Sequence, residues 1–215
     1  MIQVLIADDH TILREGLKQI LSEHPHLEVV GEAENGLEAL KQIRARHFDV
    51  VVLDMSMPGR SGIELIKQIK DEKPSLPILI LSMHKEDHYA VRTLKAGASG
   101  YLSKDSASTQ LVHAIDKVAA GGMFISAAVA EKLAFGLRQS GDALPHTTLS
   151  DREYQIFLML VHGDGLTEIA DQLNLSVKTV STHKSRIMEK MALENLSGLI
   201  KYAIRHRLID EIDDD

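Results

Sequence analysis

The first 120 residues repeat one pattern five times: a short apolar run rich in β-branched residues, a turn, and a longer amphipathic stretch. Several of these runs are apolar throughout instead of alternating, as expected for strands that helices cover on both faces. The stretches between them carry apolar residues at helical spacing, for example Ile12, Leu17, Ile20 and Leu21. Regular alternation of strand and helix predicts an α/β fold with a doubly wound, five-stranded parallel sheet. The predicted strands are Ile2–Ala7, Leu27–Gly31, Val50–Leu53, Pro77–Ser82 and Gly100–Leu102.

A change of pattern near residue 138 predicts a second, smaller domain. Gly121-Gly122 ends one helical stretch, and Ser126–Leu137 has the pattern of a further helix. Residues 138–148 are polar, contain Gly and Pro and lack periodicity, which is typical of a linker. From Leu149 onward no strand pattern appears. An all-α domain is therefore predicted, with four short helices near 150–162, 166–173, 177–191 and 196–206.

The net charge is spread unevenly along the chain. The whole sequence has 24 basic and 31 acidic residues, a net charge of −7, and this balance taken alone disfavours binding to nucleic acid. Residues 1–145 carry −3, residues 146–209 carry +1, and residues 210–215 carry −5. The acidic end therefore masks a helical domain whose basic residues gather in its last two helices.

Several classes of protein are disfavoured by what the sequence lacks. Because there is no Cys, a disulfide-stapled scaffold, a cysteine nucleophile and a thiolate zinc site are excluded. No Gly-x-Gly-x-x-Gly follows the first strand and no P-loop is present, so dinucleotide and P-loop nucleotide binding lack support. Two Asp residues interrupt the first apolar run too early for a signal peptide or a membrane span. We therefore expect a cytoplasmic protein without a membrane association.

Polar side chains follow the ends of four predicted strands. Asp8 and Asp9 close the first strand, Asp54 the third and Ser82 the fourth, and Lys104 follows the fifth. The carboxyl ends of parallel strands meet at one edge of an open sheet, where ligands bind at the reversal of strand order. Each Asp alone would be interpreted as a helix cap or turn residue, but the set predicts a cation site. Oxygen ligands, with no His or Cys at these positions, suit Mg²⁺ or Mn²⁺, and Lys104 and Ser82 would hold the oxygens of a phosphoryl group on Asp54.

The segment 166–191 has the pattern of a helix-turn-helix, with Ser176 as a natural N-cap for the helix 177–191. The apolar residues expected to face inward on this helix are Val177, Val180, Ile187 and Met191. One exposed polar face is expected to contain Lys178, Ser181, Thr182 and Ser185, flanked by Lys184 and Arg186. This face either is simply solvated or enters a DNA major groove, with hydroxyls near base edges and cations on phosphates.

Residues 1–120 resemble the receiver domain of two-component response regulators, which has a flavodoxin-like fold. The motifs are Ala-Asp-Asp-His, Leu-Asp-Met-Ser-Met-Pro-Gly, Ile-Leu-Ser-Met-His and Gly-Tyr-Leu-Ser-Lys-Asp. The resemblance implies that Asp54 is the phosphoacceptor and that Lys104 forms a salt bridge with its phosphoryl group. It also implies a Mg²⁺ site made by Asp8, Asp9 and the Ser56 backbone carbonyl, and a switch pair, Ser82 and Tyr101, that reorients on phosphorylation.

The C-terminal part resembles the four-helix LuxR-type DNA-binding domain. The matching segments include Leu149-Ser150-Asp151-Arg152-Glu153, Ile169-Ala170 and Thr179-Val180-Ser181-Thr182-His183. Together the two parts are similar to the NarL/FixJ family of transcriptional response regulators. The resemblance implies DNA contacts by Lys178, Thr179, Ser181, Thr182, Lys184, Ser185 and Arg186. It also implies a dimer contact through the last helix, at Leu199, Ile200, Ala203 and Ile204, for which a core role within one chain is an equal alternative.

The expected organisation is a receiver domain over 1–122, a linker helix and linker over 123–148, a LuxR-type domain over 149–209 and an acidic tail over 210–215. Such a protein is a transcription regulator, not an enzyme. Its expected partners are a sensor histidine kinase, double-stranded promoter DNA and a second copy of itself.

Two other functions compete with this interpretation. A Mg²⁺-dependent phosphohydrolase of the haloacid-dehalogenase type needs a second acid two residues after its nucleophile, where this chain has Ser56. A regulator with a degenerate receiver would ignore phosphate, but the complete set of acids, hydroxyl and lysine speaks against it.

Overall fold

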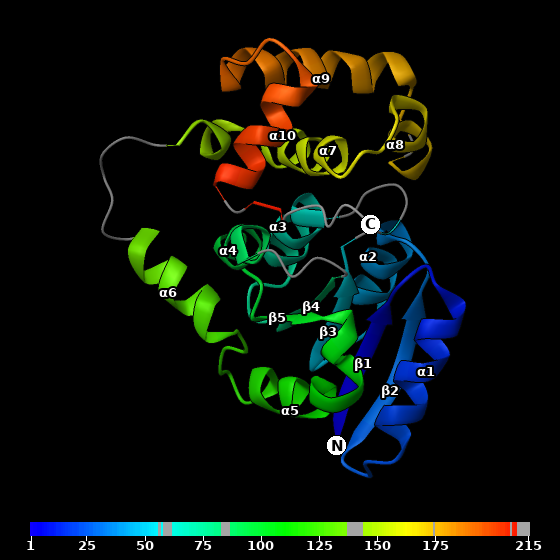
Figure 1. Cartoon of the computed structure of the whole chain (residues 1–215). Coiled ribbons are helices and arrows are strands. Elements are labelled where there is room, and N and C mark those ends of the chain that lie inside the picture. The colour runs from blue at the N-terminus through cyan, green and yellow to red at the C-terminus, as the bar shows by residue number, and fades with distance from the viewer. Residues whose placement is uncertain are drawn as a thin grey trace. The chain divides into compact units, whose positions relative to one another are not determined.

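The structure, a computed structural model, describes residues 1–55, 57, 62–82, 87–136, 144–173, 175–206 and 208–209. The chain divides into two compact units, Met1–Ala134 and Phe135–Asp215, called here the first and second units (Figure 1). None of the helices in these described ranges has the length and apolar composition that a membrane span requires. The predicted Ser56 ligand and the acidic tail 210–215 lie outside the described residues.

The first unit contains the predicted five-stranded parallel sheet, in the strand order β2-β1-β3-β4-β5. The strands are β1 (Ile2–Ala7), β2 (Leu27–Ala33), β3 (Val50–Asp54), β4 (Ile78–Ser82) and β5 (Gly100–Ser103). The chain moves from β1 outward to β2 and then crosses back to β3, so the strand order reverses between β1 and β3. This reversal places the carboxyl ends of β1 and β3 beside each other, with Ala7 paired to Leu53.

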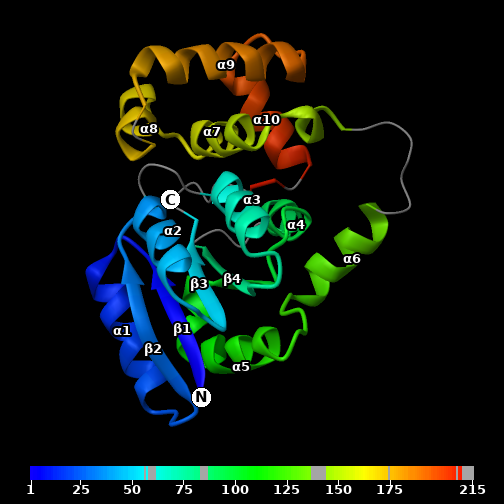
Figure 2. The same ribbon diagram turned by 180° about the vertical axis from the view of Figure 1, so that it is seen from behind.

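Helices cover both faces of the sheet (Figures 1 and 2). One face is covered by α1 (Thr11–Ser22) and α5 (Ala107–Ala119), and the other by α2 (Gly36–Ala45), α3 (Gly62–Glu72) and α4 (Asp87–Lys95). Successive strand side chains point to opposite faces, so Val4 and Ile6 join Leu17 and Leu111 in the core beneath α1 and α5. The central strand β3 and its neighbour β4 are buried along their whole length, in agreement with the runs predicted to be covered on both faces, whereas the edge strand β2 carries Glu28 and Glu32.

A short segment after α5 extends the sheet beyond β5. The Phe124 amide donates to the Ser99 carbonyl at 3.1 Å, and the Tyr101 amide donates to the Phe124 carbonyl at 2.8 Å. A Cβ on Gly100 would lie 3.0 Å from the Phe124 carbonyl oxygen, so glycine permits this approach. The chain then enters α6 (Ala127–Gly136), in agreement with the helix predicted over Ser126–Leu137.

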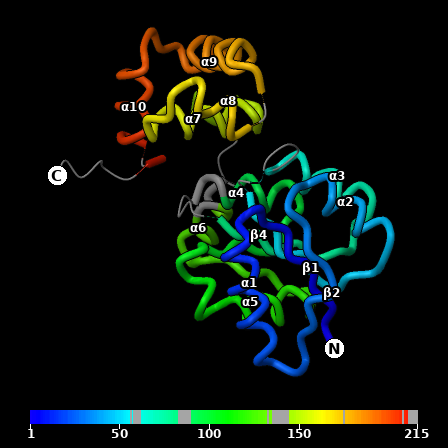
Figure 3. The backbone as a smooth tube through the Cα atoms, turned by 90° about the vertical axis from the view of Figure 1, so that its right-hand side faces the viewer, coloured from blue at the N-terminus to red at the C-terminus, as the bar shows by residue number. Residues whose placement is uncertain are grey.

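The second unit is all-helical and contains α7 (Asp151–Val161), α8 (Leu166–Gln172), α9 (Val177–Met191) and α10 (Leu196–Arg205). Helix α9 packs across α7 and α8 (Figure 3). Side-chain caps fix the helix starts: Ser150 and Glu153 form a capping box on α7, and Ser176 and Asn195 cap α9 and α10. Buried Tyr154, Phe157, Ile169, Val180, Ile187 and Leu199 form the core.

The end of the predicted linker is part of this helical unit. Residues Pro145–Thr148 form a 3₁₀ helix, and His146 is buried within it. The His146 Nδ1 atom lies 2.8 Å from the Tyr202 hydroxyl on α10, and its ring lies against Tyr154 and His206. The sequence around His146 is polar and aperiodic and does not indicate burial, because the burial depends on a hydrogen bond with a residue far along the chain.

Candidate functional site

The predicted acidic residues meet at the carboxyl ends of β1 and β3. Asp8 is 1% exposed and Asp54 is fully buried, whereas Asp9 is about one-third exposed. The Lys104 ammonium lies between the two buried carboxylates, 2.9 Å from Asp8 Oδ2 and 3.0 Å from Asp54 Oδ2. The structure thus brings together four of the predicted residues: Asp8, Asp9, Asp54 and Lys104.

The charge of Lys104 is stabilised by its neighbours. Burial by itself lowers the pKa of Lys104, but the nearby carboxylates of Asp54 and Asp8 outweigh that effect and raise the pKa above its ordinary value. Lys104 is therefore an ammonium at neutral pH. It supplies one positive charge to a pocket that holds three carboxylates.

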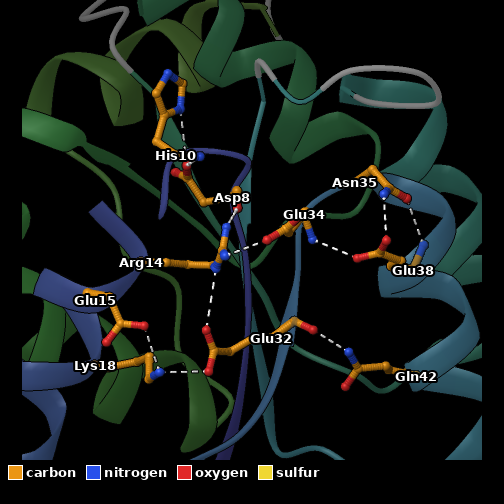
Figure 4. Close-up of polar contacts among 10 residues, drawn as sticks. All are labelled: Asp8, His10, Arg14, Glu15, Lys18, Glu32, Glu34, Asn35, Glu38 and Gln42. Carbon is orange, nitrogen blue, oxygen red and sulfur yellow. Dashed lines mark hydrogen bonds and ion pairs between the residues drawn. The ribbon is translucent and has the colours of Figure 1, made fainter. Parts of the chain in front are cut away.

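Sequence reasoning missed His10. Its Nδ1 atom lies 3.2 Å from Asp8 Oδ1, and its backbone amide donates to the same oxygen at 2.7 Å (Figure 4). The Nδ1 atom also lies 3.1 Å from Asp9 Oδ1. His10 is therefore a further possible ligand beside the predicted oxygen ligands. A residue just beyond the strand end can turn its ring back over the carboxylates, a direction that strand periodicity does not describe.

Arg14, in the second turn of α1, was also missed. Its guanidinium is buried and donates from Nη1 to the Asp8 main-chain carbonyl at 2.6 Å (Figure 4). The same group contacts Glu32 Oε2 at 3.3 Å and Glu34 Oε1 at 2.8 Å, in β2 and just after it. Arg14 therefore fixes the turn that carries Asp8 and Asp9 to the end of β2.

The cluster fits a hard divalent cation. One ligand atom from each of Asp8, Asp9, His10 and Asp54 can be chosen so that all four lie within 4.8 Å of one another. The buried Oδ2 atom of Asp8 and Oδ1 atom of Asp9 receive no hydrogen bond from the described residues apart from the ion pair with Lys104 and the contact with the His10 ring. Carboxylate oxygens crowded in this way are a suitable donor set for a metal ion.

The predicted switch residues lie on the two strands next to this cluster. Ser82 ends β4 and is fully buried, and Tyr101 on β5 is 8% exposed. The strands pair in parallel register, with Ile80 opposite Tyr101 and Ser82 opposite Ser103. Tyr101 also lines a cavity of about 290 Å³ together with Phe124, Ile125 and Val129, residues of the segment that leads into α6.

In the second unit, α8 and α9 form the predicted helix-turn-helix. Val180, Ile187 and Met191 are buried as expected, but Val177 is 44% exposed, and its predicted inward position is wrong. Helical periodicity assigns Val177 to the buried stripe, yet it does not show where along the axis the neighbouring helices end. Val177 is the first residue of α9, beyond that packing.

The predicted DNA-contact residues form one accessible surface of α9. Lys178, Ser181, Thr182, Ser185 and Arg186 are exposed, and Thr179 and Lys184 are partly exposed. Lys190, also on α9, forms an ion pair within the second unit, because its ammonium lies 2.6 Å from the buried Glu153 carboxylate. The cations near the predicted contact surface are therefore Lys178, Lys184 and Arg186.

Helix α10 divides between the two roles considered for it. Leu199 and Ala203 are fully buried in the second unit, so the core role is correct for them and their predicted dimer contact is wrong. Ile200 and Ile204 stay partly exposed. These two residues are the part of the predicted dimer contact that remains accessible.

Both units match known protein families. Residues 4–116 match the response regulator receiver domain, and residues 147–203 match the luxR family of bacterial regulatory proteins. The chain is 39% identical to the response regulator UvrY of Escherichia coli over 209 residues, which is 97% of this chain and 96% of UvrY. It is 38% identical to the response regulator GacA of Pseudomonas protegens over 210 residues, covering 98% and 99% of the two chains.

A solved structure of RcsB from Salmonella enterica, bound to the promoter rprA in the presence of the phosphomimetic BeF₃⁻, has a TM-score of 0.64 to this chain. The two are 29% identical, and the similarity covers 94% of this chain and 97% of RcsB. The same family is indicated by the acid cluster with its lysine, by the helix-turn-helix and by these relatives, which match this chain over nearly its full length. The chain belongs to the two-component response regulators of the NarL/FixJ family, which join a receiver domain to a LuxR-type DNA-binding domain.

Proposed function

We propose that Asp54 accepts a phosphoryl group from a sensor histidine kinase and that the phosphorylated protein binds promoter DNA as a homodimer. The observation that carries this proposal is the ion pair between buried Asp54 and Lys104 beside Asp8 and Asp9. A carboxylate at this position is a nucleophile whose product charge already has a cationic partner.

In the transfer, a carboxylate oxygen of Asp54 forms a bond to phosphorus, and the bond between phosphorus and the phosphohistidine nitrogen of the kinase breaks. The product is an acyl phosphate. Lys104 neutralises one of its oxygens, and the Ser82 hydroxyl donates to another. Asp8, Asp9, Asp54 and the Ser56 carbonyl would hold Mg²⁺, or Mn²⁺ in its place, and the bound ion would supply further positive charge beside the phosphoryl group.

The kinase is proposed to approach over α1 and α5. An apolar hollow of about 550 Å³ lies there, lined by His10, Ile12, Gly16, Lys104 and Ala107 among others. Ile12 is 91% exposed at its edge. Because His10 and Lys104 belong to the acid cluster and also line the hollow, a partner seated there would be beside the phosphoacceptor.

The response is proposed to start at Ser82 and Tyr101. Movement of Ser82 toward the phosphoryl group leaves room for the Tyr101 ring, and Tyr101 is hydrogen-bonded through its amide to Phe124, just before α6. We assign 1–122 to the receiver, 123–148 to the linker helix and linker, 149–209 to the DNA-binding domain and 210–215 to an acidic tail. The family matches over 4–116 and 147–203 support these limits.

DNA binding is assigned to α9 through Lys178, Thr179, Ser181, Thr182, Lys184, Ser185 and Arg186, with Ile200 and Ile204 of α10 in the dimer contact. The RcsB complex with promoter DNA supports this assignment by analogy. Because the protein is proposed to bind promoter DNA, its proposed location is the cytoplasm.

The phosphoacceptor can be tested by mass spectrometry. The protein is incubated with Mg²⁺ and acetyl phosphate, the acyl phosphate is reduced with borohydride, and the labelled residue is sequenced. We expect the label on Asp54, a strong loss of labelling when EDTA is added, and no label in Asp54→Asn. A label on any other residue of the wild-type protein would overturn the proposal.

A further inference from the structure

The hydroxyls of α9 are not equivalent. The Thr182 hydroxyl donates to the Lys178 carbonyl at 2.9 Å, and the Ser185 hydroxyl donates to the Ser181 carbonyl at 3.1 Å. The Thr179 hydroxyl lies 2.8 Å from the capping hydroxyl of Ser176. Ser181 is exposed, and its side chain forms no hydrogen bond with the part of the chain that the structure describes. Of the four hydroxyls on the proposed DNA surface, only that of Ser181 has no hydrogen bond to the described residues.

This difference decides what each side chain can offer to a base. A hydroxyl has one hydrogen to donate, and in Thr182 that hydrogen already serves the helix backbone. Thr is also β-branched, so its χ1 angle is stiff in a helix, and the hydroxyl bond to the residue four positions earlier selects one rotamer. Ser185 lacks the branch and can leave its bond by rotating, so the same constraint does not hold for it.

An exposed Thr with a committed hydroxyl presents its methyl group. Thr182 is the sixth residue of α9, in the half of a recognition helix that reaches base edges in the major groove. In that groove thymine is the base with a methyl group, and a Thr methyl is a suitable apolar contact for it.

We propose that Thr182 recognises one thymine per half-site by contact between its methyl group and the 5-methyl of the base, while its hydroxyl stays bonded to Lys178. This inference rests on the proposed binding of DNA by α9. It assigns the methyl group to sequence recognition and the hydroxyl to the helix.

The proposal can be tested with two variants that separate the groups. Thr182→Ser keeps the hydroxyl and removes the methyl, whereas Thr182→Val keeps a methyl and removes the hydroxyl. The full-length protein, treated with Mg²⁺ and acetyl phosphate, first selects its site from a random double-stranded library. Each thymine of the selected duplex is then replaced singly by deoxyuridine, which removes only the 5-methyl group, and binding is measured by fluorescence anisotropy.

For the wild-type protein, we expect one thymine in each half-site whose replacement weakens binding about fourfold, the change that corresponds to burying one methyl group. Thr182→Val should keep this sensitivity to the thymine methyl. Thr182→Ser should bind the thymine and deoxyuridine duplexes equally. Because the Thr182 side chain is exposed, we expect both variants to fold, and thermal melting of each variant checks this.

Two results would overturn the inference while leaving DNA binding intact: no thymine sensitive to demethylation, or a sensitive thymine whose effect persists in Thr182→Ser. Loss of the effect in Thr182→Val but not in Thr182→Ser would assign recognition to the hydroxyl instead. A library without any enriched sequence would overturn the proposed DNA binding itself, and this inference with it.

Discussion

The two functional surfaces of this protein are organised in opposite ways. The acid cluster of the first unit consists of buried charges, with Asp8, Asp54 and the Lys104 side chain almost inaccessible to solvent. The α9 surface of the second unit consists of exposed hydroxyls and cations, and the hydroxyls of Thr182 and Ser185 donate to carbonyls of their own helix. One site is held by the tertiary structure around it and the other by one helix.

This contrast has a physical basis in the proposed chemistry. A buried carboxylate interacts strongly with an added phosphoryl group or cation, because water screens the interaction little. A DNA-binding surface must instead stay accessible, and dissolved salt weakens the attraction between its cations and the DNA phosphates. Changes in the acid cluster should therefore affect folding and phosphorylation together, whereas changes on α9 should affect DNA binding alone.

Removal of Lys104 should have the largest effect. Lys104→Met leaves the buried Asp8 and Asp54 carboxylates without their shared cation, so we expect the free energy of unfolding to fall by about 3 kcal/mol. Urea unfolding in EDTA measures this change, and Mg²⁺ should restore part of it. An unchanged midpoint in EDTA would show that these charges are less strongly coupled to the fold than the geometry implies.

Removal of Arg14 should have the second largest effect on stability. Arg14→Met removes the buried donor to the Asp8 carbonyl and to two Glu side chains, for an expected loss of about 2 kcal/mol in unfolding free energy. Weaker Mn²⁺ binding by isothermal titration calorimetry should accompany it. Lys18→Met is the matched control, because it lies on the same helix and also pairs with Glu32, but at the surface. Equal losses in both variants would contradict the positioning role of Arg14.

Ala192 allows a test in the second unit that leaves both surfaces unchanged. Ala192 ends α9 in the left-handed region, at φ 52° and ψ 45°. Ala192→Gly removes the strain on its Cβ, so we expect a gain of about 0.5–1 kcal/mol in stability, measured by thermal melting. DNA affinity should stay constant, and a fall in stability would show that the left-handed cap is wrongly assigned.

Lys184 should give the smallest change, and only in DNA binding. Lys184→Ala should weaken binding to all sequences about threefold and reduce the slope of log affinity against log salt by about one. Fluorescence anisotropy at several salt concentrations measures both quantities. If only the preference for one base changed, Lys184 would contact a base edge and not a phosphate.

Much of this architecture could be predicted from the sequence because the signals are local. Apolar runs define the strands, and Asp8, Asp54 and Ser82 are placed by their positions at strand ends. The helix-turn-helix follows from helical spacing and the Ser176 cap. Each of these inferences needs only a short window of sequence.

His10 contacts only its neighbours Asp8 and Asp9, but the other missed polar residues depend on contacts between residues that are distant in the sequence. Arg14 is buried because Glu32 and Glu34 on another strand and loop receive its guanidinium. His146 is buried because Tyr202, 56 residues later, meets its ring. Periodicity could not separate Leu199 and Ala203 from Ile200 and Ile204, because an apolar stripe on α10 suits both a core and a dimer contact.

Control of DNA binding by phosphorylation of Asp54 can be tested by measuring the affinity of the protein for the selected duplex. Wild-type protein and Asp54→Asn are titrated with and without acetyl phosphate and Mg²⁺. We expect acetyl phosphate to tighten DNA binding by the wild-type protein about tenfold, the size of a typical allosteric coupling, and to leave the affinity of Asp54→Asn unchanged. An equal response of the two proteins, or a wild-type affinity that the donor does not change, would contradict it.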